Sequence, residues 1–233
     1  MKSQYIIAAV VILIIVIGIS NIKVPTKTAP LSAGEVLVNA PAVDDKGNGV
    51  STILRVSAKP GTGKVLVDVN QIIFWADTQQ SIQTARSVAQ QATNNDLSKV
   101  DLTYSIDTNA SLIEGPSAGA ALTIATIAAL ENKTLNNSVM ITGTINPDGT
   151  IGEVGGISAK ASAAKSTGAT LFLVPQGQGV KVNYEPEQEC EQIASYTICT
   201  TTYKPTSNQT GEINGIRVVE VSDIQDALKY FFR

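Results

Sequence analysis

The chain has 233 residues, with 17 basic and 20 acidic side chains, a net charge of −3 and no histidine. This length suits one globular domain with a short additional segment. Without histidine, the chain cannot form a Ser-His-Asp triad, a Cys-His pair or a histidine-ligated zinc or haem site from its own residues. Two cysteines are too few for a zinc or iron–sulfur centre, so we expect neither a metal nor a cofactor. Any hydrolytic chemistry must use a base other than imidazole.

The first segment has the composition of a membrane anchor. Residues 5–22 are 18 residues without a charged side chain, and Lys2 precedes them. This is close to the shortest run that spans a bilayer, and no polar face interrupts it. We therefore predict an N-terminal transmembrane anchor or signal segment at residues 1–23 and a linker at 24–34. Whether the segment is cleaved stays open, because a secretory signal has the same basic start and apolar core.

The rest of the chain is long enough to be translocated largely regardless of its charge, so we expect a single-pass membrane protein with an extracytoplasmic domain. Beyond residue 23, 15 basic residues face 20 acidic ones, which disfavours a nucleic-acid partner. Cys190 and Cys199 are separated by eight residues. Outside the cytoplasm we expect these two cysteines to form a disulfide. Four glycosylation sequons fit this location without proving it, and begin at Asn109, Asn132, Asn136 and Asn208.

The order of predicted elements indicates one α/β or α+β domain at residues 35–233. Strands are expected at 35–40, 50–58 and 64–69, and the turn residues 59–63 predict that the last two form a hairpin. The later predictions are helix 78–92, strand 100–106, an apolar helix 117–130, strand 139–142, turn 146–149, helix 158–166, strand 170–174, strand 216–221 and a last helix to 232. Residues 176–213 form an insertion that contains both cysteines.

Three motifs imitate functional signatures and fail on their own residues. Pro60–Lys64 lacks the first glycine of a phosphate-binding loop and the hydroxyl residue that should follow the lysine. Asp44–Gly49 imitates a calcium loop, but Lys46 occupies a ligand position. Gly115–Gly119 matches the G-x-S-x-G elbow of α/β-hydrolases, which needs a later histidine that this chain lacks. The first two are interpreted as turns.

Ser117 nevertheless lies where a nucleophile can act. It falls in the first turn of the apolar helix, where free backbone N–H groups and the positive end of the helix dipole can stabilise an oxyanion. Gly115 and Gly119 allow backbone and substrate to approach closely. Without a base, the serine would be only a helix cap. A buried lysine can supply that base, because desolvation lowers its pKa, and Lys160 is the candidate because its neighbours are small and uncharged.

These residues resemble the proteolytic domain of the Lon protease family, whose members are Ser-Lys dyad peptidases. Three blocks carry the resemblance: Glu114–Gly119, Val139–Thr144 and Ile151–Lys160, with 43 residues from Ser117 to Lys160. The resemblance implies a Lon-like α/β fold for residues 35–233 outside the insertion.

The resemblance also implies roles for individual residues. Ser117 is expected to be the nucleophile, Lys160 the general base, and Thr142 the residue that orients the lysine. The backbone N–H groups around Gly115, Ser117 and Ala118 are expected to form the oxyanion hole.

The chain is thus expected to be an ATP-independent serine endopeptidase that cleaves unfolded or flexible polypeptides, since it has no phosphate-binding loop. Family members form hexameric rings largely with help from an ATPase module, so a homo-oligomer stays open here. Two alternatives also stay open: a non-catalytic Lon-like module that binds or scaffolds polypeptides, and a dyad amidase or esterase for small substrates. The natural substrate, the cleavage preference and the role of the 176–213 insertion are not determined by the sequence.

Overall fold

A computed structural model describes residues 34–68, 76–108, 115–193 and 196–232. The predicted anchor at 1–23, nearly all of the 24–34 linker and the sequon at Asn109 lie outside the described residues. None of the helices within the described ranges has both the length and the apolar character needed to cross a bilayer.

The first sheet has four strands in the order β1-β2-β4-β3. Their bounds are β1 Gly34–Val43, β2 Gly49–Pro60, β3 Val65–Val67 and β4 Val100–Asp107. Along β4, buried and partly exposed residues alternate without interruption, as expected for a strand with one face on the core. β1 and β2 form the hairpin of this sheet, and the Asp44 carboxylate closes their turn by accepting from the amides of Lys46 and Asn48 at 3.0 and 2.7 Å.

The predicted hairpin between 50–58 and 64–69 is wrong. β3 pairs in parallel with β4, which lies between it and β2. The cause is Asp101, whose carboxylate accepts hydrogen bonds from the amides of Thr62 and Lys64 at 2.7 and 2.8 Å. Gly61 N also donates to Lys99 O. These contacts carry the chain across the end of β4, so the turn residues form a crossover instead of a hairpin.

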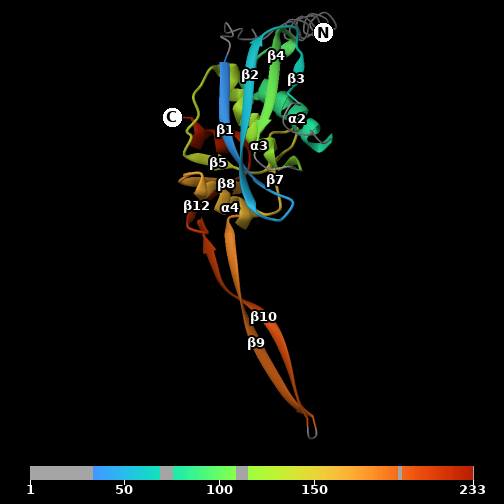
Figure 1. The fold of residues 1–233 in the computed structure, drawn as a ribbon, viewed down its shortest axis with the longest axis vertical. Helices are drawn as coiled ribbons and strands as arrows, with labels where there is room; N and C mark the ends of the chain where they lie inside the picture. The colour runs from blue at the N-terminus through green and yellow to red at the C-terminus, as the bar shows by residue number, and fades with distance from the viewer. Residues whose placement is uncertain (1–33, 69–75, 109–114, 194–195, 233) are drawn as a thin grey trace, which may run out of the picture.

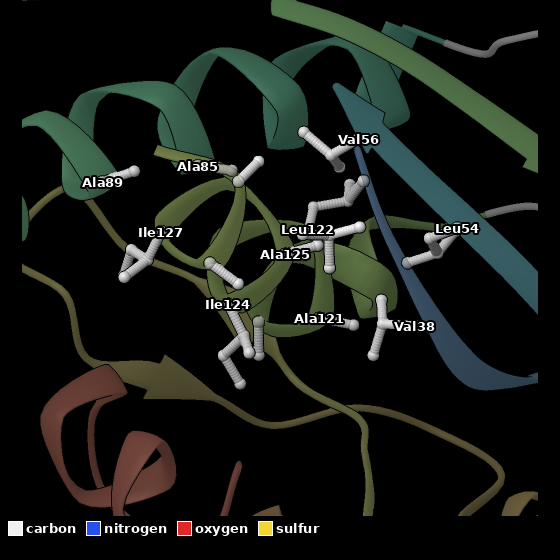
Figure 2. Close-up of a cluster of buried hydrophobic side chains, with 14 of the residues drawn as sticks. Val38, Leu54, Val56, Ala85, Ala89, Ala121, Leu122, Ile124, Ala125 and Ile127 are labelled. Atoms are coloured by element: carbon white, nitrogen blue, oxygen red, sulfur yellow. The ribbon is translucent and has the colours of Figure 1, made fainter. Parts of the chain in front are cut away.

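Two helices cover this sheet. α2 (Ala76–Thr93) and α3 (Gly119–Glu131) pack on each other, and every residue of α3 up to Leu130 is buried. Figure 2 shows why α3 is buried. Leu122 and Ala121 of α3 lie toward the sheet residues Val38, Leu54 and Val56, and α2 covers another face of α3 with Ala85 and Ala89. The apolar helix predicted from Ser117 therefore exists, but a separate 3-10 turn, η2 (Pro116–Ala118), precedes it.

The second sheet has the order β11-β12-β8-β5, with β5, β8 and β12 parallel. The remaining bounds are η1 Leu97–Lys99, β5 Val139–Ile141, β6 Thr144–Ile145, β7 Ile151–Gly152, α4 Ile157–Ser166, β8 Leu171–Pro175, β11 Glu212–Ile213, β12 Ile216–Val221 and α5 Ile224–Phe231. The helices and strands predicted after residue 78 are confirmed within a few residues, and the mixed α/β class with them.

Helix α4 joins the two sheets. It packs on β1 and β2 of the first sheet and on β8, β11 and β12 of the second. At Gly49 the contact is so close that an added Cβ would lie 1.9 Å from the carbonyl oxygen of Ala159. On the other side, Ala161 and Ala164 belong to a second hydrophobic cluster that includes Phe172. Small residues in α4 therefore allow it to fill the seam between the sheets.

The predicted insertion at 176–213 contains a long antiparallel ribbon. β9 (Val180–Ile193) pairs with β10 (Tyr196–Thr210), and the ribbon projects from the body beside β8, β12 and α4 (Figure 1). Cys190 lies directly opposite Cys199 in the register, and the predicted disulfide joins them. The bond therefore crosslinks the ribbon in the half farther from the body.

Candidate active site

Ser117 lies in the short turn that precedes α3 and is partly exposed. Gly115 starts this turn with φ of 99°, a conformation that favours glycine, and Pro116 follows. Within the turn, Gly119 N donates to Pro116 O. The Ser117 N–H comes before the i→i+3 bonds of this turn, so the turn does not use it. The oxyanion hole expected from the N–H groups around Gly115, Ser117 and Ala118 stays a prediction.

The carbonyl oxygen of Ser117 is held by the segment that follows β5. It accepts hydrogen bonds from Gly143 N at 3.0 Å and from the Thr142 hydroxyl at 3.3 Å, while Gly143 O accepts from Ala120 N at 3.0 Å. Gly119 is close to β6, since a Cβ there would lie 2.7 Å from the side chain of Ile145. The backbone around Ser117 is therefore held by the segment after β5 and by the close approach of Gly119 to β6.

Sequence reasoning missed this clamp on the Ser117 carbonyl. Gly143 has φ of 154°, and a Cβ at this position would lie 2.3 Å from the Ile151 side chain. Thr142 itself is fully buried. A Thr-Gly pair directly after a short apolar strand was the available signal, but only the fold shows which carbonyl it contacts.

Lys160 is buried, with 4% of its surface exposed, in the first part of α4. Its backbone N–H donates to Gly156 O at 2.9 Å. Among the described residues the ammonium group has no hydrogen-bond or ion-pair partner, and burial lowers the pKa of Lys160 from 10.5 to about 8. Lys165, on the same helix, is exposed and donates to Asn214 O. The predicted burial of Lys160 is therefore confirmed, and Lys165 shows that burial is not a general property of lysines on this helix.

The fold brings these residues to neighbouring elements. The turn η2 and helix α4 both pack on β1, and Thr142 contacts the turn directly. Thr142 gives its only hydroxyl proton to Ser117 O and keeps its lone pairs for an ammonium donor. The predicted role of Thr142 in orienting Lys160, and the predicted role of Lys160 as the base for Ser117, stay predictions. Within the described ranges no group of three or more acidic or cysteine side chains is placed to bind a metal ion.

The fold places a candidate nucleophile, Ser117, and a buried candidate base, Lys160, on neighbouring elements, as expected for the class of serine hydrolases in which a lysine replaces histidine. The model of the Lon protease (S16) C-terminal proteolytic domain matches residues 50–202. The chain therefore belongs to the Lon protease family and carries its serine peptidase domain. The matched range contains Ser117, Thr142 and Lys160, so the resemblance found in the sequence is confirmed.

Individual relatives show the same similarity. A Lon protease of Phenylobacterium zucineum is 26% identical over 166 residues, which cover 65% of this chain and 21% of that protein. An archaeal Lon protease of Thermoplasma volcanium is 30% identical over 98 residues, 42% of this chain and 15% of that protein. A Lon protease of Lawsonia intracellularis is 28% identical over 176 residues, 74% of this chain and 20% of that protein. The chain thus spans about a fifth or less of the length of these relatives.

Proposed function

We propose that this protein is a serine endopeptidase that cleaves unfolded or flexible polypeptides without ATP, with Ser117 as nucleophile and Lys160 as general base. The observation that carries the proposal is the burial of Lys160, which lowers its pKa to about 8. At pH 7, about one molecule in ten then has a neutral amine, whereas an ordinary lysine with a pKa of about 10.4 is almost wholly protonated.

The reaction follows from these positions. The neutral Lys160 amine takes the proton of the Ser117 hydroxyl while Oγ attacks the peptide carbonyl carbon. The N–H groups of Ser117 and Ala118 donate to the oxyanion. The lysine then returns its proton to the leaving amine, and an ester remains on Ser117. Water, deprotonated by the same amine, attacks the ester and releases the carboxylate product, after which the hydroxyl is restored.

The clamp on the Ser117 carbonyl supports this chemistry. Oxyanion donors are effective only when they are fixed before the reaction begins. Here the bonds from Thr142 and Gly143 to Ser117 O restrain the peptide unit that contains the Ala118 N–H. The restraint therefore acts on a donor and on the nucleophile at once.

Independence from ATP is part of this proposal, and the assay below tests it by leaving ATP out. We further propose that residues 5–22 anchor the chain in a membrane and that the peptidase domain lies outside the cytoplasm. The uncharged apolar run after Lys2 and the disulfide between Cys190 and Cys199 support this location. Membrane fractionation combined with protease digestion of intact cells tests it. A chain that is recovered in the soluble fraction, or protected together with cytoplasmic markers, would contradict the proposal.

The central experiment measures casein cleavage by the full chain in detergent, without ATP. Wild type is compared with Ser117→Ala and Lys160→Ala, and with Lys165→Ala as a matched control from the same helix. We expect cleavage by wild type and Lys165→Ala, and at least a thousandfold loss in the other two, as in other enzymes that lose a nucleophile or its base. A panel of small esters and amides separates an endopeptidase from a small-substrate hydrolase. If all folded chains are equally inactive, the non-catalytic polypeptide-binding module becomes the better explanation.

A further inference from the structure

A groove lies between β3 and α2, apart from the residues assigned to peptide hydrolysis. Its volume is about 780 Å³, and its walls include Val65 and Val67 from the strand and Ile82, Gln83 and Arg86 from the helix. This volume lies within the range of about 300–1,000 Å³ that is typical of ligand-binding pockets. The groove is lined mainly by apolar and amide side chains, and Arg86 is the one charged residue among its described lining.

One wall of the groove is an open sheet edge. β3 is the outermost strand of its sheet, and no strand of the described residues pairs with its outer side. Lys64 O accepts a hydrogen bond from β4, and Asp68 N donates one to β4. Because backbone groups alternate in direction along a strand, the N–H and C=O groups of Val65 and Val67 point toward the open edge. The side chains of Val65 and Leu66 are 38% and 47% exposed, so this edge is not covered.

The other wall carries an incompletely bonded cation. The Arg86 guanidinium donates from Nη2 to Leu97 O at 3.3 Å. Its Nε–H is buried and has no acceptor among the described residues. A buried donor of this kind normally has a partner, and the planar guanidinium favours a carboxylate that accepts from two N–H groups at once.

We propose that this groove binds the C-terminal tail of an extended polypeptide. The tail adds to the open edge of β3 by main-chain hydrogen bonds to Val65 and Val67. An apolar side chain of the tail contacts Ile82, and the terminal carboxylate accepts from Arg86 Nε–H and a terminal N–H. The strand edge alone would accept any extended segment, and Arg86 adds the requirement for a free carboxylate. Binding of this kind does not require the peptidase reaction, so it can fail or succeed independently of the proposed function.

Fluorescence anisotropy of the full chain in detergent tests the proposal. The chain carries Ser117→Ala so that the probe is not cleaved. The probe is a dye-labelled peptide of alternating valine and threonine with a free C-terminal carboxylate, and its matched control is the same peptide with a C-terminal amide. We expect the amide to bind at least about tenfold more weakly, since hydrogen bonds to charged groups are worth more than neutral ones.

Three variants locate the site. Arg86→Gln should remove the difference between acid and amide, whereas Arg217→Gln, at an exposed position of β12, should retain it. Val65→Pro removes an outward N–H at the first residue of β3, where proline is tolerated, and should weaken both peptides. Equal binding of acid and amide by the parent chain would overturn the proposal without reference to any variant. An unchanged acid-to-amide ratio in Arg86→Gln, or unchanged affinities in a folded Val65→Pro, would also overturn it.

Discussion

Replacing Lys160 with methionine should stabilise the protein at neutral pH. The native pKa is about 8 and the ordinary value is 10.5, so a charged Lys160 lowers the free energy of unfolding by about 3 kcal/mol below pH 8. Methionine has a similar length and no charge to desolvate, and it fills irregular spaces well. Lys160→Met should therefore raise the free energy of unfolding at pH 7 by a few kcal/mol, while it abolishes peptidase activity.

The pH dependence provides the sharper test. Between pH 8 and 10.5 the unfolded chain retains the proton that the native Lys160 has lost, so wild type becomes more stable as pH rises. Relative to Lys160→Met, wild type should gain about 2.5 kcal/mol between pH 7 and pH 10. Urea unfolding followed by circular dichroism measures this difference, with Lys165→Met as the exposed control. A difference between wild type and Lys160→Met that is constant from pH 7 to pH 10 would refute the reasoning.

Four other outcomes are expected. The rate of casein cleavage should rise along a single limb with a midpoint near the Lys160 pKa of about 8 and then level off, and a flat profile from pH 6 to 10 would contradict a lysine base. Thr142→Val removes the donor to Ser117 O and should lower kcat about tenfold, whereas Thr142→Ser should retain most activity; equal kcat values would show that this bond does not matter. Gly49→Ala places a Cβ against Ala159 O and should cost about 1–3 kcal/mol in thermal or urea unfolding and also reduce activity, while Gly155→Ala, which has open space, should be neutral. Replacing both Cys190 and Cys199 with serine should speed amide exchange in the ribbon and leave the melting temperature of the body nearly unchanged; a large fall in that temperature would show that the bond stabilises the whole domain.

Local patterns predicted most of the elements because their burial follows their period. The alternation along β4 and the mostly apolar sequence of α3 are visible in the sequence, and both are retained in the fold. The pairing of β3 was mispredicted because Asp101, almost forty residues later in the chain, bonds the turn after β2. Turn chemistry can indicate a change of direction, but it cannot show which strand will be adjacent.

For the candidate site, as for the fold, the sequence predicted individual residues but not the contacts between elements. Ser117 and Lys160 stand out because a serine before an apolar helix and a lysine among alanines are unusual local combinations. The resemblance to a known family added Thr142. The bonds from Thr142 and Gly143 to Ser117 O depend on how β5 meets the start of α3. That relation is tertiary, so no short stretch of sequence contains it.

The position of α4 between the two sheets has a consequence for when activity can arise. Ser117 precedes a helix of the larger hydrophobic cluster, whereas Lys160 lies on the helix that connects that cluster to the smaller one. The clusters are not separate bodies, because β8 contributes Leu173 to the larger one and Phe172 to the smaller one, on opposite faces of the same strand. We therefore expect the proposed Ser117–Lys160 dyad to be assembled only when both faces of this sheet are packed, and a partly unfolded copy to be inactive.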